Sequence, residues 1–328
     1  MRAAYYDQKG PARDVLRIGE IDTPRPGPGE VLVRVHASAV NPSDTKTRSG
    51  WRSTPAMPYP RIVPHQDGAG IIEAVGDRVR RSRVGERVWL YESQWQRPFG
   101  SCAEYIALPA DRAVPLPDRT SFVEGACLGI PAMTAHRCVF ADGPVSGHTI
   151  LITGGAGVVG YYAIQLARWG EATVIATVSS DEKAARARQA GAHHVINYRT
   201  DDVSKAVREL TSGAGVHRVV DVALGVNLPT SVEVLRPNCA IAAYASDEQP
   251  EPVLPFRPML AKDLMLRMVL VYVMPPSAKQ AAIADITNLL ERGVFRHQIA
   301  ATLPLEDVVA GHELVETGRR IGAVVITM

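Results

Sequence analysis

The residues best suited to chemistry in this chain are three glycines that follow a short apolar run. The segment 149–153 is rich in β-branched side chains and leads into Gly155-x-Gly157-x-x-Gly160. In such a loop the first glycine makes the turn, the second admits a pyrophosphate and the third lets helix and strand pack closely, while the helix N-terminus offers unpaired N–H groups. A glycine-rich turn alone would not need this spacing. We therefore predict a dinucleotide site at Gly155, Ala156, Gly157, Val158, Val159 and Gly160.

The end of the next predicted strand, 173–178, indicates which dinucleotide is bound. A fold that prefers NAD places a carboxylate there to bind the ribose 2′-hydroxyl. Here the strand is followed by Ser179 and Ser180, and Lys183 comes soon after. Hydroxyl groups and a positive charge suit a 2′-phosphate, so we predict NADPH rather than NADH. The alternative is that Lys183 is only a solvated residue in the first turn of a helix.

The elements that must position these residues alternate between strand and helix from about residue 123. Strands are predicted at 149–153, 173–178, 194–197, 217–222 and 239–244. Helices are predicted at 124–139, 158–169, 181–190, 201–211 and 227–235. This alternation is typical of a doubly wound parallel sheet with helices on both faces, an α/β fold.

The remainder of the chain has a different pattern. Residues 1 to about 122 are β-rich: Val31–Ser38 alternates apolar with other residues, and clusters of Pro and Gly separate further strands at 70–75, 87–91 and 102–108. Short strands at this spacing favour a barrel or sandwich. After Pro258 we expect a strand-like segment at 264–272, helices at 278–292 and 304–317, and a strand at 323–327. This tail is too small to fold alone, so we expect it to join the N-terminal domain, with the ligand in a cleft between the two domains.

Composition limits the possible partners. The 328 residues are 46% hydrophobic and 21% charged, with a formal net charge of +2. These values are ordinary for a globular protein, and the small charge argues against nucleic acid or an anionic membrane as the main partner. No apolar stretch approaches the ~20 residues that span a bilayer. The first residues lack a signal peptide's apolar region, and the four cysteines form no CxxC pair, so we expect a cytoplasmic protein without disulfides.

Several motifs, in order along nearly the whole chain, resemble the medium-chain dehydrogenase/reductase superfamily. They are Asn41-Pro42-Ser43-Asp44-Thr45, Asp67-Gly68-Ala69-Gly70, Gly85-Glu86-Arg87-Val88, Gly129-Ile130-Pro131-Ala132-Met133-Thr134-Ala135 and Ala190-Gly191-Ala192. Together they are most similar to the zinc-free quinone oxidoreductase branch, the ζ-crystallin-like enzymes. The resemblance implies a GroES-like catalytic domain (residues 1–122 with 267–328), a Rossmann domain that binds NADPH (residues 123–266) and a homodimer.

The same resemblance implies further cofactor contacts. Near the adenosine phosphate it places Tyr198, together with Arg319 or Arg320. Around the nicotinamide end it places Thr134, Ala223, Leu224, Gly225, Tyr244, Ala245, Ser246, Val271 and Tyr272. For each of these residues, ordinary packing is the alternative interpretation.

A catalytic metal is not expected. Zinc alcohol dehydrogenases use this scaffold with a ligand cysteine, but Asn41 occupies the corresponding position. His65 lies where a ligand histidine would, yet one histidine without partners cannot form the three-ligand site that zinc requires. His193 and His194 are adjacent on a predicted strand and point to opposite faces, which makes them poor co-ligands. We therefore expect His65 to be a hydrogen-bonded structural residue.

The chemistry implied by the resemblance is hydride transfer from NADPH to a quinone, in which the cofactor carries the reaction and the protein orients it. Asn41 is the predicted donor to the substrate carbonyl, because its amide donates without titrating. Asp44, Lys46 and Arg52 are possible neighbours. Related enzymes often have tyrosines near the last two positions, and the two cations here would favour a polar or anionic acceptor if they face the substrate.

Two other functions remain open at this stage. The first is an NADPH-dependent alkenal or enone reductase, because an activated alkene is also an electron-poor acceptor for hydride. The second is an NADPH-binding structural or RNA-binding protein without turnover. The lack of an aromatic and basic stripe argues against RNA as the main partner.

Overall fold

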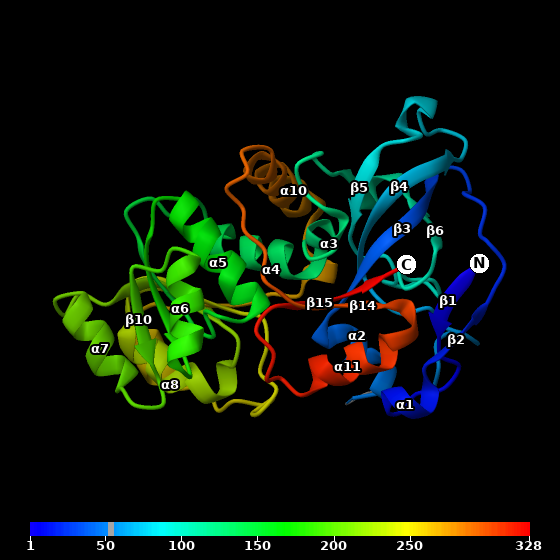
Figure 1. Cartoon of the computed structure of the whole chain (residues 1–328). Helices are drawn as coiled ribbons and strands as arrows, with labels where there is room; N and C mark the ends of the chain where they lie inside the picture. The colour runs from blue at the N-terminus through cyan, green and yellow to red at the C-terminus, as the bar shows by residue number, and fades with distance from the viewer. Residues whose placement is uncertain (52–55) are drawn as a thin grey trace. The chain divides into compact units, whose positions relative to one another are not determined.

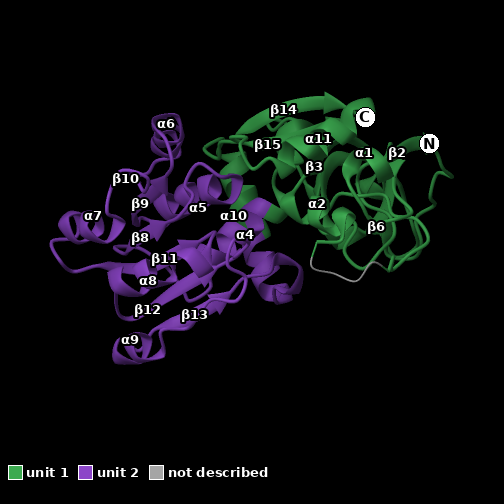
Figure 2. Ribbon diagram, turned by 90° about the horizontal axis from the view of Figure 1, so that it is seen from below, with its two compact units in different colours: residues 1–130, 283–328 green, residues 131–282 purple. Residues whose placement is uncertain are grey.

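The chain folds into two compact units, seen in a computed structural model that describes residues 1–51 and 56–328 (Figure 1). Unit 1 comprises Met1–Ile130 and Ile283–Met328, and unit 2 comprises Pro131–Ala282 (Figure 2). The C-terminal segment therefore belongs to the same unit as the N-terminal residues. Both boundaries fall inside helices, α4 (Gly129–Phe140) and α10 (Pro276–Glu291).

Unit 2 is built on a six-stranded parallel sheet with the order β10-β9-β8-β11-β12-β13. The strands are β8 (Thr149–Ile152), β9 (Thr173–Val178), β10 (His194–Asn197), β11 (Val216–Asp221), β12 (Leu235–Ala243) and β13 (Met265–Met268). Counted along the chain this is the order 3-2-1-4-5-6, the Rossmann arrangement, and it reverses between β8 and β11. Ligands of such sheets bind at the carboxyl edge next to this reversal.

Helices cover the sheet because its strands are apolar on both faces. They are α5 (Val158–Trp169), α6 (Asp181–Gln189), α7 (Val203–Leu210), α8 (Leu224–Val234) and α9 (Phe256–Ala261). Contacts of α5 with β8 and β9, and of α8 with β11 and β12, bury the sheet centre (Figure 1). The doubly wound sheet predicted from the sequence is confirmed.

Unit 1 contains a seven-stranded sheet in which β14-β15-β3-β4-β5-β7 are neighbours and β6 also pairs with β3. Its strands are β3 (Glu30–Val40), β4 (Asp67–Val75), β5 (Arg87–Leu90), β6 (Tyr105–Pro109), β7 (Ala113–Pro115), β14 (Ile299–Pro304) and β15 (Ala323–Thr327). The alternation in β3 is confirmed, because Val31, Val33, Val35 and Ala37 are all buried. Antiparallel pairing of β15 with β3 ties the C-terminal segment to this sheet.

Smaller elements complete unit 1. A separate ribbon pairs β1 (Arg2–Tyr5) with β2 (Arg17–Glu20). The helices, besides parts of α4 and α10, are α1 (Ala12–Val15), α2 (Pro42–Ser49), α3 (Phe122–Gly125) and α11 (Val308–Glu316), with short 3₁₀ turns η1 (Arg81–Arg83), η2 (Ala110–Arg112) and η4 (Leu305–Asp307).

Among the predicted elements, two differ most in extent from the structure. The helix expected at 124–139 is divided into α3 and α4, because α4 starts afresh at Gly129, where the buried Asp67 carboxylate accepts the backbone N–H of Ile130 at 2.9 Å. The strand expected at 264–272 is only β13, followed by a 3₁₀ turn, η3 (Val271–Val273).

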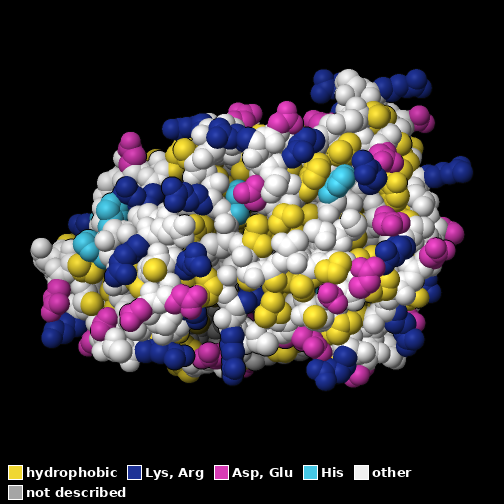
Figure 3. Space-filling view, in the orientation of Figure 1, with side chains coloured by type: hydrophobic (Ala, Val, Ile, Leu, Met, Phe, Trp, Pro, Cys, Tyr) yellow, Lys and Arg dark blue, Asp and Glu magenta, His cyan; other side chains and the backbone are white. Residues whose placement is uncertain are grey.

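The surface has mixed charge. On the face drawn in Figure 3, basic and acidic side chains are intermingled rather than gathered into regions of one sign. Within the described residues, no helix combines the length and apolar character needed to cross a lipid bilayer.

Candidate functional site

The predicted glycine loop lies between β8 and α5, at the reversal of strand order. Gly157 is the N-cap of α5, and no side chain caps this helix end. A Cβ atom on Gly160 would lie 2.3 Å from the carbonyl oxygen of Gly154, which confirms that the third glycine permits close packing. The residue with the positive φ of a tight turn is Gly154 (φ +64°), one position before the predicted Gly155.

Gly155 has a different task from the one predicted. Its backbone N–H donates to the carbonyl of Thr177 at 2.9 Å, and an added Cβ would lie 2.8 Å from the Cβ of Ala176. It therefore lets the loop lie directly against β9. A Cβ on Gly157 would meet only the Gly154 oxygen, at 3.2 Å, so the approach to the uncapped end of α5 is open to an anion. The loop thus fits a pyrophosphate.

A cavity of about 450 Å³ continues from this loop along the carboxyl edge of the sheet. Thr177 near the end of β9 lines it, together with Gly154, Tyr198 and Ala223, which follow β8, β10 and β11. Tyr198 and Ala223 were predicted from the family resemblance, and Tyr198 is half exposed (52%), so its ring is accessible. The cavity has the position expected for a nucleotide in a doubly wound sheet.

Asp221, the last residue of β11, organises the cavity and was missed by the sequence analysis. Its buried carboxylate accepts hydrogen bonds from Thr153 Oγ1 (3.0 Å), the backbone N–H of Ala223 (2.9 Å), Asn227 Nδ2 (2.8 Å) and Ser231 Oγ (3.1 Å). These bonds fix the loop after β11 against the end of β8. The available signal was an acidic residue that ends a strand directly after the apolar pair Val219-Val220.

The three residues predicted for the 2′-phosphate lie together at the end of β9. Ser180 is the N-cap of α6, and its hydroxyl accepts the backbone N–H of Lys183 at 3.3 Å. The ammonium group of Lys183 donates to Ser179 Oγ at 2.9 Å. A hydroxyl and a cation are thus held side by side, which is the donor set that a phosphate monoester prefers.

The residues predicted for the nicotinamide end lie on neighbouring loops of unit 2. The backbone N–H of Leu224 donates to the carbonyl of Ala245 at 3.0 Å, so the loops after β11 and β12 meet. Gly225 N–H donates to Ser246 Oγ at 2.9 Å and ties them further. Tyr244 directly follows β12, and burial raises its pKa well above the usual value. Thr134 is buried on α4.

The other predicted cofactor residues lie apart from these loops in the chain. Val271 and Tyr272 form the 3₁₀ turn η3, with Val271 buried. Arg319 and Arg320 belong to unit 1, in the segment between α11 and β15. Arg320 donates to the carbonyl of Gly322 at 2.8 Å, and burial lowers its pKa. Their contacts with a cofactor stay predictions.

In unit 1, Asn41 is held by two acids, one through its backbone and one through its side chain. Its backbone N–H donates to Asp44 Oδ2 at 2.7 Å, and its amide Nδ2 donates to Asp67 Oδ2 at 2.8 Å. An amide nitrogen carries two hydrogens, and the bond to Asp67 uses one of them. Burial raises the pKa of Asp44 to about 7 and that of Asp67 well above its usual value. Asp67 was not predicted as a site residue, although it orients the amide that was.

His65 is fully buried in a chain of hydrogen bonds. Its Nδ1 faces Ser38 Oγ at 2.8 Å and its Nε2 faces His312 Nε2 at 2.9 Å. Burial lowers its pKa to about 3, so the ring is neutral near pH 7. This is the environment of a structural histidine. In the part of the chain that the structure describes, no group of three or more His, Cys, Asp or Glu is arranged to hold a metal ion.

The remaining candidates have simpler surroundings. The rings of His193 and His194 lie 6.5 Å apart, and His193 Nδ1 accepts the backbone N–H of Val174. The ammonium of Lys46 lies 4.6 Å from the centroid of the Trp51 ring. Arg52, the other cation predicted near the substrate, lies outside the described residues.

Comparison with known proteins supports the interpretation of both units. A model described as "Alcohol dehydrogenase GroES-like domain" matches residues 27–118, and one described as "Zinc-binding dehydrogenase" matches residues 158–288. A 2-haloacrylate reductase of Burkholderia sp is 32% identical, covering 99% of this chain and 98% of its own length. The quinone oxidoreductase of Homo sapiens is also 32% identical, covering 97% and 94%.

Solved structures agree over the entire chain. The quinone oxidoreductase of Escherichia coli complexed with NADPH is 25% identical, with a TM-score of 0.87 and full coverage of both chains. A mycobacterial protein complexed with NADPH is 28% identical, with the same TM-score and coverage. Identity above 30% with relatives matched along almost their full length leads to one conclusion: this chain belongs to the medium-chain dehydrogenase/reductase superfamily, in its quinone oxidoreductase branch.

Proposed function

We propose that this protein is an NADPH-dependent reductase that passes hydride to a quinone without a metal. The observation that carries the proposal is the cluster of Ser179 and Lys183 at the end of β9, where a carboxylate would favour NAD. Relatives and solved structures named as quinone oxidoreductases, some with NADPH bound, support the same assignment.

In this proposal the bound dinucleotide supplies the hydride, and the chain's own residues bind and orient. The amides at the start of α5 hold the pyrophosphate, with Gly157 leaving space for it. Ser179 and Lys183 hold the 2′-phosphate. Asn41 donates its remaining amide hydrogen to the substrate carbonyl, and Asp67 fixes the direction of that amide through the 2.8 Å bond to Nδ2. A fixed donor stabilises the negative charge that develops on oxygen.

A second candidate is reduction of an activated alkene that carries a negative charge. It is favoured by Lys46 on α2, the helix that begins directly after Asn41, and by the similarity to a 2-haloacrylate reductase, whose named substrate carries a carboxylate. An alkene of this kind needs the same hydride donor, so the two candidates differ only in how the acceptor is recognised.

The deciding experiment is steady-state oxidation of NADPH and NADH with a benzoquinone, a 2-alkenal and a 2-haloacrylate, using the wild type and Asn41→Ala. We expect NADPH to be preferred and a quinone to be reduced. Asn41→Ala should lower kcat by roughly 10²-fold, the loss typical of an oxyanion donor, with little change in KM for NADPH. Preference for the haloacrylate would replace the quinone assignment, and tight NADPH binding without turnover would favour a non-enzymatic role.

We also propose a cytoplasmic homodimer. All four cysteines are free thiols, as a reducing compartment favours. Strand β13 lies at the edge of the parallel sheet and carries the exposed side chains of Met265 (48%) and Met268 (65%), followed by Leu270 and Val273. Such an apolar edge requires cover, and pairing of two β13 strands would supply it.

A further inference from the structure

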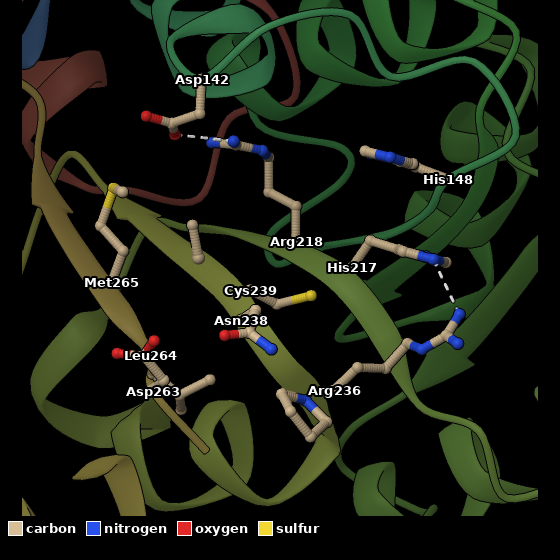
Figure 4. Close-up of a pocket in the computed structure, with 12 residues that line it drawn as sticks. Asp142, His148, His217, Arg218, Arg236, Asn238, Cys239, Asp263, Leu264 and Met265 are labelled. Atoms are coloured by element: carbon tan, nitrogen blue, oxygen red, sulfur yellow. Dashed lines mark hydrogen bonds and ion pairs between the residues drawn. The ribbon is translucent and has the colours of Figure 1, made fainter.

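A second cavity, of about 600 Å³, lies in unit 2 at the amino edge of the parallel sheet. Residues that precede or open strands line it, whereas the dinucleotide residues follow strands, so the two sites are at opposite edges of the sheet. Figure 4 shows the lining side chains that carry charge or an imidazole ring: Asp142, His148, His217, Arg218, Arg236 and Asp263.

The two arginines of this cavity differ in how their charge is balanced. Arg218 forms an ion pair with Asp142 at 2.7 Å and donates to the carbonyl of Cys138 at 3.1 Å. Asp142 is also paired with Arg267, so both oxygens of this carboxylate are engaged. Arg236 has no carboxylate partner among the described residues, and its guanidinium lies against the ring of His217, with Nη1 2.7 Å from Nε2.

That contact cannot be an ordinary hydrogen bond. The backbone N–H of Thr149 donates to His217 Nδ1 at 2.9 Å, so Nδ1 must be the acceptor nitrogen. Burial, Arg236 and His148, whose ring is stacked on His217 at 4.7 Å, lower the pKa of His217 and keep the ring neutral. A neutral ring then carries its one hydrogen on Nε2. An arginine N–H and an imidazole N–H therefore point into the same space. Both are donors, so neither can accept a hydrogen bond from the other.

We propose that this cavity binds an anion with a carboxylate or phosphate group, held between the guanidinium of Arg236 and the Nε2–H of His217. An oxyanion supplies the acceptor that both donors lack, and a guanidinium fork matches its geometry. The nearby acids do not compete with an anion for Arg236. Asp142 is already paired with two arginines. Asp263 is exposed and lies on the far side of Asn238 from Arg236 (Figure 4).

Titration calorimetry of the NADPH-saturated protein tests the site, with inorganic phosphate and malonate as probes for the two kinds of group. Saturating NADPH keeps the 2′-phosphate position filled. We expect saturable binding of at least one probe, weakened at least tenfold by Arg236→Gln, which is about 1.4 kcal/mol. Arg236→Lys, which keeps the charge but not the fork, should bind with intermediate affinity. The matched control is Arg257→Gln, which removes an exposed arginine on α9 and should leave affinity unchanged.

A second variant separates the site from general effects of folding. In His217→Asn the side-chain oxygen can still accept from Thr149, while the Nε2–H is lost, so the melting temperature should hold and affinity should fall. Lys183→Ala should bind both probes as the wild type does. The proposal is overturned if neither probe binds at millimolar concentration, or if Arg236→Gln and Arg257→Gln bind equally well.

Discussion

At the scale of single residues, the choice of cofactor depends on a few donors at the end of β9. Ser180 caps α6 and so fixes the first turn that carries Lys183, while Lys183 reaches back to Ser179. The local sequence sets this arrangement, because a serine N-cap accepts the backbone N–H of the residue three positions later. The preference for NADPH should therefore respond to a single substitution.

The first prediction concerns Lys183→Ala. Loss of the ammonium should raise KM for NADPH by roughly tenfold, as expected for a lost charge-assisted hydrogen bond, while KM for NADH stays near the wild-type value. Initial-rate measurements with both coenzymes check this. Equal increases for NADPH and NADH would remove Lys183 from the 2′-phosphate site.

The second prediction concerns acid stability and the buried pair His65 and His312. Burial lowers both pKa values, that of His65 to about 3, so unfolding below the ordinary histidine pKa of ~6.5 takes up protons. These histidines therefore make the free energy of unfolding fall as pH decreases from about 6.5 toward 3, and leave it unaffected above that range. The raised pKa of Asp44, about 7, has the opposite sign, because its burial favours the protonated folded state.

His65→Asn isolates this effect, because asparagine tolerates the positive φ of +80° at this position. The variant should show a smaller slope of unfolding free energy against pH, by up to about 1.4 kcal/mol per pH unit for one proton. Denaturant unfolding at several pH values measures it. The contribution of Asp44 is common to both proteins, so an unchanged slope would mean that His65 is not buried in its neutral form.

At the scale of elements, the connection from β8 to α5 combines packing and binding in neighbouring glycines. An added Cβ on Gly160 would lie 2.3 Å from the Gly154 oxygen, whereas one on Gly157 would lie 3.2 Å from the same oxygen, a much milder contact. A substitution at Gly160 should therefore mainly affect stability, and one at Gly157 should mainly affect cofactor affinity.

The third prediction uses this pair as matched alanine variants. Gly160→Ala should lower the free energy of unfolding by about 1–3 kcal/mol, because the backbone must move to admit the methyl group. Gly157→Ala should lose less stability than Gly160→Ala but bind NADPH more weakly, since the methyl group occupies the approach to the pyrophosphate. Thermal unfolding and fluorescence titration of NADPH distinguish the two. Equal stability losses would contradict the separation.

At the scale of the whole molecule, the exposed apolar edge β13 is the feature that calls for a partner. Met265 and Met268 are exposed although the same strand continues a buried sheet through its pairing with β12. A second copy of the chain offers the same strand, so antiparallel pairing across a two-fold axis would extend the sheet without new elements.

The fourth prediction is that Met268→Lys shifts the protein from dimer to monomer, because a charge on the edge strand resists pairing. Light scattering at micromolar concentration measures the mass of both proteins. Val84→Lys, which places the same charge at an exposed apolar position of unit 1, is the control and should stay dimeric. A wild-type monomer would refute the proposed assembly.

The sequence by itself determined the elements and the chemistry of local segments. Several features depend on residues within about a turn of each other, where spacing alone sets geometry. They are the glycine loop, the alternation of strands and helices in unit 2, the alternation in β3 and the Ser179–Lys183 cluster. The division into α3 and α4 escaped prediction because it depends on Asp67, which is distant in sequence.

Only the tertiary structure decided which distant side chains meet. Four contacts join residues from separate elements. They are the bond of Asn41 to Asp67, the four donors that Asp221 accepts, the pair of His65 with His312 and the contact of Arg236 with His217. The physical reason is burial: a polar group removed from water must find its partner wherever the packed strands and helices bring one, and no local pattern records that choice.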